Sequence, residues 1–501
     1  MSTDIKRKIL IIGAGPGGLS AGMILAHRGF DVTIYEKKPF IGGRNSALKI
    51  DGYTFELGPT FVILPQTFRE IFSLAGRNID DMLEIKSLDP LYELHYDDGR
   101  AITMYFDKPK LKQEIARLFP GEEVGYEKFM ISQKKKFDRL YACLKVPYIR
   151  FYNYLRWKLI KAAPVLDLGV SVHDVLSRYF KDEDLKIAMA FQAKYLGMSP
   201  WECPGAFTIL SYVEHEFGVH HPIGGVHKIS EAMGKVVEEN GGKINLGMGV
   251  KEVILEGKKA KGVLLENGEK VFADAVIMNA DFAEGMSHLF KNEDRSKYND
   301  ESLAKKDYSC STFMLYLGID KKYEMKHHQI FFAKDYKKNV EQIFNGKTLP
   351  EDPSFYIQNV SVTDTTLAPD GHSTVYVLVP VPNQKDTKID WTIEKKRYRD
   401  LVIKKIIEKT GLVDLEEHIK VEKVITPADW QNDANVYDGA VFNLSHSLDQ
   451  MLYLRPHNRL EGYKDFYIVG GGTHPGSGLP TIMESGRIVA DLIGGSVKTN
   501  S

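Results

Sequence analysis

The sequence has few cysteines and no excess of charge of either sign. Its three cysteines, Cys143, Cys203 and Cys310, lie far apart in the chain. This spacing excludes a disulfide framework and a zinc motif, and it is typical of a reducing compartment. The 66 Lys and Arg residues nearly balance the 67 Asp and Glu residues, so the formal net charge is −1. A dedicated nucleic-acid-binding protein carries a basic excess, so we expect no nucleic-acid partner.

A long apolar run is also missing. No stretch of about 18 uncharged apolar residues occurs, so no membrane-spanning helix is predicted. The apolar run near the N-terminus enters a glycine-rich turn within a few residues and lacks a small-residue cleavage site, which makes it a poor signal peptide. We therefore expect a cytoplasmic protein, either soluble or attached to a membrane surface. Its 501 residues allow roughly three domains.

A glycine-rich turn follows the first apolar run, at residues 8–12. The turn carries the pattern GxGxxG at Gly13, Gly15 and Gly18, and a predicted helix and a second strand, ending at Glu36, follow it. These glycines suit a tight turn, a close approach of backbone to a pyrophosphate, and close helix–strand packing. A helix N-terminus binds phosphate, and an acid at this distance accepts hydrogen bonds from ribose hydroxyls. We predict dinucleotide binding; an unrelated glycine-rich turn would not explain Glu36.

The segment after Glu36 favours a flavin dinucleotide over NAD. A second glycine pair, ending at Gly43, is followed at once by Arg44. A nicotinamide dehydrogenase does not need these residues, whereas a longer cofactor continues past the pyrophosphate. Arg44 is a candidate partner for phosphate or ribityl groups, because a guanidinium matches phosphate oxygens. The alternative is an ordinary surface ion pair.

Similar signals return late in the chain. Residues 467–472 form a predicted strand that runs into glycines, and residues 481–492 have the pattern of a helix. Two such turns suggest one cofactor held by two distant segments, although a simple glycine-rich loop is the alternative. Between them, residues 250–272 alternate like strands around a predicted Asn267-Gly268 hairpin, and residues 275–279 read as a buried strand.

Four motifs, in order along the chain, carry a resemblance to a known family. They are GAGPGGLSAG from Gly13, YEKKPFIGGR from Tyr35, FELGPT from Phe55 and GGGTHPGSGLP from Gly470. Together they resemble the flavin amine-oxidase superfamily and, more narrowly, the bacterial-type carotenoid desaturases that act on phytoene or diapophytoene. The stretches that support the narrower match are FGVHHPIGG from Phe217, DYSCS from Asp307, SVTDTTLAP from Ser361, TPAD from Thr426 and LRPHN from Leu454.

The resemblance implies an FAD-dependent desaturase that introduces conjugated double bonds into a C30 or C40 polyisoprenoid. Its FAD would be non-covalent, one substrate hydrogen would leave as hydride to the flavin, and oxygen or a quinone would reoxidise the flavin. The residues that fall on the family's adenosine and phosphate contacts are Gly13, Gly15, Gly18, Glu36, Gly43 and Arg44. Those that match its other cofactor-lining segments are Gly58, Pro59, Thr60, Val250, Gly472, Leu479 and Pro480. No metal site is expected.

The sequence does not assign a catalytic base. The crowded candidates are Glu214, His215, Glu216, His220 and His221. For each of them a solvated, capping or packing role is the stronger interpretation. We find no triad, metal cluster or paired-carboxylate motif. This fits a reaction in which the cofactor supplies the difficult chemistry and the protein supplies orientation and an apolar tunnel.

We expect an α/β protein with a discontinuous Rossmann-like FAD-binding domain, a mixed α+β substrate domain and a helical, membrane-facing cap. The FAD-binding domain would comprise residues 1–75, 225–300 and 455–501. The substrate domain would comprise residues 76–99 and 301–454, with strands at 312–319 and 374–381 and a helix at 400–410. The cap would comprise residues 100–224.

A basic, aromatic segment within the cap indicates how a long apolar substrate arrives. Residues 139–166 contain no acid. On a helix that starts after Pro147, one face would carry Tyr148, Phe151, Tyr152, Leu155 and Leu159. Such a helix is typical of a membrane interface, so we predict peripheral attachment to the inner face of the membrane. The alternative is a basic helix packed on the protein's own core.

Other functions share parts of this pattern. A carotenoid end-group oxidase, an isomerase or a retinoid saturase would use the same scaffold. An amine or porphyrinogen oxidase would share the cofactor motifs without the interior stretches. A protein resembling the Rab GDP-dissociation inhibitors would share the fold without flavin, and the intact glycine and Glu36 set counts against it. The sequence leaves open the substrate length, the number of desaturations, the product isomer and the oligomeric state.

Overall fold

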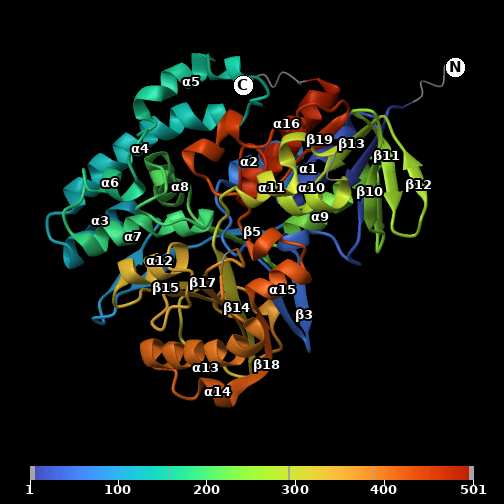
Figure 1. Cartoon of the computed structure of the whole chain (residues 1–501). Coiled ribbons are helices and arrows are strands. Elements are labelled where there is room, and N and C mark those ends of the chain that lie inside the picture. Colours follow the sequence, from blue (N-terminus) through green and yellow to red (C-terminus); the bar gives the residue numbers. More distant parts are fainter. Residues whose placement is uncertain (1–5, 156, 292–293, 386, 496–501) are drawn as a thin grey trace.

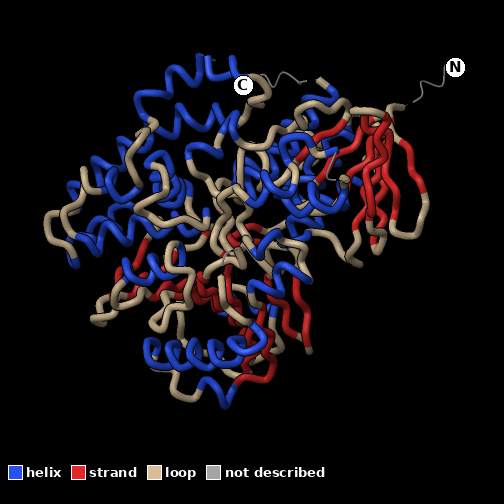
Figure 2. Tube along the Cα trace, in the orientation of Figure 1, coloured by secondary structure: helices blue, strands red, loops and turns tan. Residues whose placement is uncertain are grey.

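The structure, a computed structural model, describes residues 6–155, 157–291, 294–385 and 387–495. Figure 1 shows three regions: a sheet with helices around it at the upper right, a group of helices at the left, and a second sheet with helix α13 below. Figure 2 shows that strands concentrate in the two sheet regions, whereas the third region is mainly helical.

The first region is built on a parallel sheet of five strands, in the order β19-β13-β1-β2-β9. The strands are β1 (Lys8–Ile12), β2 (Asp31–Glu36), β9 (Lys243–Leu246), β13 (Ala275–Met278) and β19 (Phe466–Ile468). They come from three stretches of the chain that are distant in sequence. The predicted last strand, 467–472, stops at Ile468 because the glycines that follow it turn away, beginning with Gly470 at φ +109°.

The two faces of this sheet follow the alternation of strand β1. Ile9 and Ile11 pack among helices α1 (Pro16–His27), α9 (Lys228–Glu239) and α16 (Leu479–Gly494). Leu10 and Ile12 pack toward helix α10 (Phe282–Leu289) and a second, antiparallel sheet. That sheet consists of β10 (Val250–Glu256), β11 (Lys259–Leu265) and β12 (Lys270–Phe272). The predicted hairpin between β11 and β12 is confirmed.

The second region is a mixed sheet in the order β18-β14-β17-β16-β15-β6-β7. Its strands are β6 (Tyr92–His95), β7 (Ala101–Met104), β14 (Ser311–Ile319), β15 (His328–Phe331), β16 (Phe355–Asn359), β17 (Ser373–Val381) and β18 (Ile419–Ile425). Helix α13 (Trp391–Thr410) packs on one face. It begins before the predicted residue 400, because the Asp390 side chain caps it by accepting a hydrogen bond from the N–H of Thr392.

The third region is helical, and it corrects one prediction. Its helices are α3 (Lys108–Leu118), α4 (Glu123–Leu144), α5 (Trp157–Ala162), α6 (Val172–Leu176), α7 (Glu183–Ala190) and α8 (Ile209–Phe217). The single amphipathic helix predicted after Pro147 is wrong. A short 3-10 helix (Phe151–Leu155) precedes α5, and residue 156 lies outside the described part. Tyr148 and Leu159 are buried, whereas Phe151 and Tyr152 are exposed, so these residues do not share one face.

Smaller elements complete the three regions. The strands are β3 (Ala47–Ile50), β4 (Tyr53–Glu56), β5 (Ile85–Ser87) and β8 (His220–Pro222). The helices are α2 (Pro65–Ser73), α11 (Asp300–Ala304), α12 (Tyr336–Phe344), α14 (Leu415–His418) and α15 (Pro427–Asn432).

Candidate functional site

A cavity of about 1480 Å³ extends between the three regions. At one end its walls are the glycine-rich turns and the strand ends of the parallel sheet, including Gly13 and Glu36. At the other end they are mainly apolar, including Phe61, Phe191 and Ile330. A polar molecule at the first end and an apolar molecule at the second would therefore share one space.

The turn between β1 and α1 forms a cradle for an anion. Gly13 has φ +93°, a conformation that favours glycine. A Cβ at Gly15 would lie 3.0 Å from Nδ2 of Asn279, and a Cβ at Gly18 would lie 2.5 Å from the carbonyl oxygen of Gly13. Gly15 is the N-cap of α1 and supplies no side-chain cap, so the first N–H groups of the helix remain available to a ligand.

Glu36 lies at the carboxyl end of β2, where it lines the cavity. Its Oε2 accepts a hydrogen bond from the N–H of Ala14 at 2.8 Å, and its Oε1 accepts one from the N–H of Lys38 at 2.9 Å. These bonds fix the carboxylate while each oxygen keeps a further lone pair. The geometry therefore suits two ribose hydroxyls as donors.

Arg44 fits both interpretations that the sequence left open, a partner for phosphate or ribityl groups and a member of an ion pair. Its guanidinium lines the cavity, and it also lies 3.6 Å from the carboxylate of Asp281 and donates to the carbonyl of Val441 at 3.0 Å. The Asp281 side chain is 5% exposed, and burial raises the pKa of this carboxyl to about 6. The Asn443 side chain donates to Asp281 at 2.5 Å. The ion pair thus holds Arg44 at the cavity wall.

The second glycine-rich loop, residues 470–478, is held by a buried arginine. The guanidinium of Arg455 is 1% exposed and donates to five carbonyl oxygens at 2.6–3.2 Å. The acceptors are Leu444, Ser445, Gln450, Gly471 and Thr473. The loop leads into α16, whose N-cap Gly478 also lacks a side-chain cap. A second helix N-terminus therefore meets the cavity.

Most of the predicted cofactor residues lie together at this cavity. Those that line it are Gly13, Gly15, Glu36, Gly43, Arg44, Gly58, Pro59, Thr60, Val250, Leu479 and Pro480. Gly18 and Gly472 do not; both are packing positions. A Cβ at Gly472 would lie 2.3 Å from Cβ of Phe282, closer than the 2.5 Å contact at Gly18.

Sequence reasoning missed several residues of the same wall. Asn279 follows β13 and approaches all three glycines of the first turn. Its place at the carboxyl end of a parallel strand was a usable signal, since ligands bind at that edge. Tyr356 and Tyr195 also line the cavity, and no motif marks them.

Buried polar side chains surround the apolar end. Thr60 Oγ1 lies 2.9 Å from the Tyr356 hydroxyl, which lies 2.7 Å from Nδ1 of His328. The Phe61 ring stacks on His328 with centroids 4.1 Å apart. Segments from the first and second regions therefore meet through one connected group at this end.

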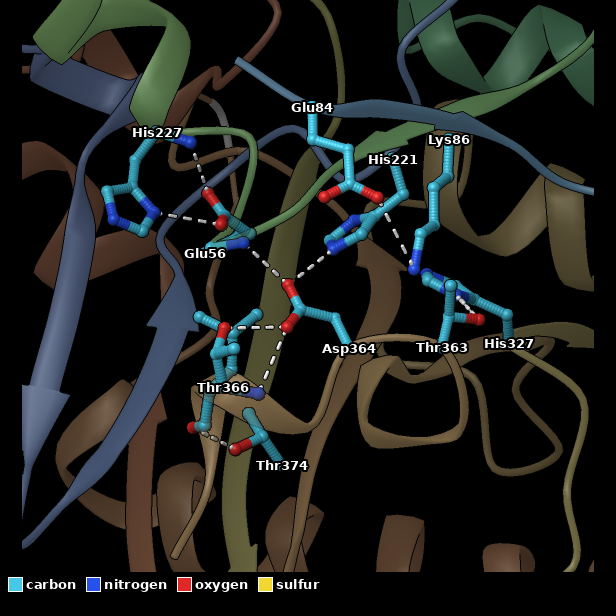
Figure 3. Close-up of polar contacts among 12 residues, drawn as sticks. Glu56, Glu84, Lys86, His221, His227, His327, Thr363, Asp364, Thr366 and Thr374 are labelled. Atoms are coloured by element: carbon cyan, nitrogen blue, oxygen red, sulfur yellow. Dashed lines mark hydrogen bonds and ion pairs between the residues drawn. The ribbon is translucent and has the colours of Figure 1, made fainter. Parts of the chain in front are cut away.

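The predicted base candidates fall into different environments. Glu214 and His215 are fully buried, whereas Glu216 forms an ion pair with Lys108. His221 Nε2 lies 2.9 Å from Oδ2 of Asp364, and both side chains are buried (Figure 3). His221 is therefore fixed in a joint between β8 and the loop before β17.

The same joint contains a second buried pair, shown in Figure 3. Nδ1 of His227 lies 3.0 Å from Oε1 of Glu56, and the His227 N–H donates to Oε2 at 3.0 Å. The N–H of Gly224 donates to Asp364 at 2.7 Å. The carboxylates of Glu56 and Asp364 thus hold the start of α9 in place beside the cavity.

Aromatic side chains are exposed on the helical region. The exposed fractions are 71% for Phe151, 58% for Tyr152 and 67% for Trp157. The Lys161 ammonium lies over the Trp157 ring at 5.1 Å, and the Arg150 guanidinium over Tyr152 at 5.8 Å. Within the described ranges, no helix is both long enough and apolar enough to cross a bilayer, and no group of His, Cys, Asp and Glu side chains could hold a metal ion.

Comparison with known proteins gives consistent results. Residues 16–494 match the family described as flavin containing amine oxidoreductase. The chain is 49% identical, over 97% of its length and 95% of the relative's, to a 4,4′-diapophytoene desaturase (4,4′-diapolycopene-forming) from a Methylomonas species. It is 36% identical to a zeta-carotene-forming phytoene desaturase from Myxococcus xanthus, over 97% of this chain and 94% of that one. A crystal structure of an oxidoreductase from Methanosarcina mazei shares the fold, with a TM-score of 0.66 and 17% identity over 97% of this chain and 100% of that one.

Proposed function

The chain belongs to the flavin-containing amine oxidoreductases, and from this membership we propose that it is an FAD-dependent desaturase acting on a carotenoid precursor. The observation that carries the proposal is a full-length relationship, at 49% identity, to a diapophytoene desaturase. The cavity supports it, because a dinucleotide cradle opens into an apolar space.

The residues at the polar end fit FAD. We propose that the free N–H groups at the start of α1 bind the pyrophosphate and that Glu36 binds the adenosine ribose. Arg44, Gly43 and Val250 would contact the central part of the cofactor, and the segments 58–60 and 479–480 its flavin end. Gly18 and Gly472 would act through packing. We further propose that residues 1–75, 225–300 and 455–501 form the FAD-binding domain.

Bound FAD supplies a hydride acceptor, which an allylic C–H bond of the substrate requires. The protein's task is to orient an unreactive hydrocarbon and to exclude water. The apolar wall serves both tasks, since Phe61, Phe191 and Ile330 offer contact area without competing hydrogen bonds.

We propose a C30 substrate, 4,4′-diapophytoene. The relative at 49% identity carries that substrate in its name, and the phytoene desaturase is 36% identical. The experiment is co-expression of this chain in a colourless bacterium with either a C30 dehydrosqualene synthase or a C40 phytoene synthase. We expect yellow to red polyenes with the C30 partner. Uncoloured precursor in both hosts, with FAD-loaded protein present, would refute desaturation and favour an end-group oxidase, an isomerase or a saturase.

We also propose that the helical cap, residues 100–224, contacts a membrane through its exposed aromatic and basic side chains. Phe151, Tyr152 and Trp157 are exposed, and Arg150 and Lys161 lie beside them, which is the composition of an interfacial segment. A substrate of this kind dissolves in lipid, so attachment at the inner face of the cytoplasmic membrane would bring the cavity to it. Substituting Phe151 and Trp157 by serine should lower binding to anionic vesicles, measured by sedimentation. A matched pair of serine substitutions at the exposed Ile393 and Val413 should leave vesicle binding unchanged.

The electrons must leave the enzyme after each desaturation. We propose oxygen or a membrane quinone as the acceptor. Reduced enzyme mixed with a soluble quinone under argon should recover its yellow colour, and the rate should be compared with that in oxygenated buffer. Failure with both would require a different acceptor.

A further inference from the structure

One lysine lines the mainly apolar end of the cavity without a carboxylate partner. Lys194 belongs to the 3-10 helix Phe191–Leu196, and it lines the cavity together with Phe191 and Leu196. Its Nζ lies 4.6 Å from the centroid of the Tyr336 ring, a cation–π contact. Within the described part of the chain, this ammonium forms neither an ion pair nor a hydrogen bond. A cation placed in this way is costly unless an anion compensates it.

The side chains next to Lys194 do not supply an anion. Leu196, Ile330 and Tyr336 belong to one apolar cluster, and Leu196 and Ile330 also line the cavity. Burial raises the pKa of the Tyr336 phenol far above neutrality, so this ring carries no charge. The wall beside the ammonium is therefore neutral.

The segment before β14 adds a thiol to this wall and no acid. The N–H of Cys310 donates to the carbonyl of Gly197 at 3.1 Å, directly after the 3-10 helix, and Cys310 lines the cavity. Burial raises the pKa of its thiol to about 12, although the positive charges of Lys194 and Lys347 oppose the rise. The thiol is neutral at physiological pH and does not act as a counter-ion.

The Lys194 ammonium keeps surface inside the protein. Its nitrogen is not enclosed like the hydroxyls of Tyr195 and Tyr336, which are fully buried. Burial nevertheless lowers the pKa of Lys194 to about 8, an effect that contact with bulk solvent does not produce. A group that protein surrounds on most sides and that still has open surface faces an internal space. For Lys194 that space is the cavity that it lines.

Two other cations of the cavity wall show the ordinary arrangement. Lys145 lines the cavity in the helical region, and its ammonium forms an ion pair with Glu70. Arg44 lies 3.6 Å from the carboxylate of Asp281 at the polar end. Of these three cations, Lys194 is the one without a described carboxylate. The missing anion is therefore expected from a ligand.

We propose that Lys194 binds the carboxylate of a ligand whose long apolar chain occupies the mainly apolar end of the cavity. The ammonium would donate to the carboxylate oxygens, while Phe191, Leu196 and Ile330 contact the chain. Two sources share this chemistry, a saturated fatty acid from membrane lipid and an isoprenoid acid formed by oxidation of a chain end. A hydrocarbon offers no group to Lys194, so this ligand class lies beyond the proposed desaturation; only competition with the hydrocarbon rests on that function.

The charge of Lys194 makes binding depend on pH. A bound carboxylate favours the ammonium form, so it raises the pKa of Lys194 above its value of about 8 in the free protein. Affinity for the acid is therefore full below about pH 8 and falls as the pH rises further. The other titratable groups near this wall do not change charge in that range, because burial raises the pKa values of the Cys310 thiol and of the phenols Tyr195, Tyr336 and Tyr356.

The test is titration calorimetry on FAD-loaded, oxidised protein. The probes are laurate, a saturated fatty acid, and farnesoic acid, an isoprenoid acid, each compared with its methyl ester. We expect the acid to bind more tightly than the ester, and Lys194→Met to weaken binding of the acid by about 10–100-fold while binding of the ester is unchanged. At pH 8 the wild type should take up protons on binding, measured as different heats in buffers of different ionisation enthalpy. Tighter binding of laurate would identify fatty acids as the source, and tighter binding of farnesoic acid would identify oxidised isoprenoids.

Two further variants keep the test sharp. Lys194→Arg retains the charge but does not titrate in this range, so it should keep the preference for the acid and lose the pH dependence. It decides the question if Lys194→Met does not fold. The matched control is Lys145→Met, which removes a cavity lysine that already has an acidic partner, so the preference for the acid should remain.

Equal affinities of acid and ester in the wild type, or wild-type affinity for the acid in Lys194→Met, would overturn the site. Loss of flavin from folded Lys194→Met would also overturn it, because the lysine would then serve the cofactor. With 4,4′-diapophytoene as substrate, laurate should raise the apparent KM and leave kcat unchanged. If diapophytoene and phytoene both fail to reduce the wild-type flavin, the proposed function fails while the calorimetric result on Lys194 stands.

Discussion

Replacing Arg455 by methionine should loosen the second glycine-rich loop and release FAD at a lower temperature. Methionine is similar in length and apolar, so it fills much of the space without serving any acceptor. Five carbonyl oxygens would lose their donor at once, two of them, Gly471 and Thr473, in the loop itself. These carbonyls are buried around a side chain that is 1% exposed, so solvent replaces the lost bonds poorly.

The magnitude follows from the cost of leaving a buried acceptor without a donor, about 1–3 kcal/mol for each, which gives about 3–5 kcal/mol in total if two or three of the five carbonyls stay unpaired. A cooperative unit of about 500 residues has an unfolding entropy near 1 kcal/mol/K, at ~2.1 cal/mol/K per residue, so that loss lowers the midpoint by roughly 3–5 °C. If the FAD-binding domain unfolds by itself, the unit is smaller and the shift is larger. The assay is the temperature at which flavin fluorescence appears, because free FAD fluoresces more strongly than bound FAD.

Arg455→Lys is the control for charge. An ammonium keeps the cation but has three donors and no planar fork, so it should recover only part of the loss. A release temperature for Arg455→Met within 1 °C of the wild type would refute the reasoning, since it would mean that the five carbonyls find other donors at little cost.

Three further predictions concern the cradle and the joint. Gly18→Ala would place a Cβ 2.5 Å from the Gly13 carbonyl oxygen. We therefore expect the free energy of unfolding to fall by about 1–3 kcal/mol and the purified protein to show a lower flavin-to-protein absorbance ratio. Glu36→Gln removes a charge from the ribose contact and should weaken FAD binding by about 10–100-fold in fluorescence titrations of the apoprotein; an unchanged affinity would contradict its role. Hydrogen bonds from His221 and from neighbouring groups lower the pKa of Asp364 despite its burial, so its contribution to stability is present above about pH 4 and is lost as the pH falls further. Asp364→Asn should therefore destabilise the protein at pH 7 and flatten its acid-induced loss of stability, measured by thermal unfolding from pH 2 to pH 7.

The parallel sheet and both glycine-rich turns were predictable from sequence because they depend on local patterns. An apolar strand, a glycine turn and a helix follow one another within residues 8–27, and each signal needs only its neighbours. The strands predicted at 312–319 and 374–381 are confirmed for the same reason. Eleven of the thirteen predicted cofactor residues line the cavity, while Gly18 and Gly472 pack beside it.

The residues that sequence reasoning missed depend on contacts between distant segments. Tyr195 and Tyr356 come from different regions, and only the packing around Phe61 brings both to one cavity. The prediction of a helix after Pro147 was wrong because a helical pattern does not show which side chains pack against distant segments. Tyr148 is instead buried beside His474, with ring centroids 5.0 Å apart. Such tertiary contacts override a local amphipathic pattern.

The parallel sheet pairs β1 with β13 and β13 with β19, and helix α1 packs against α16, although β19 and α16 lie more than 400 residues after β1. During synthesis at about 5–20 residues per second, the early glycine cradle would therefore wait tens of seconds for its second half. Cofactor capture would therefore follow the synthesis of β19 and α16. In the meantime the exposed edge of β13 and the apolar cavity wall would need protection, so yield should depend on chaperone capacity and on free FAD late in translation.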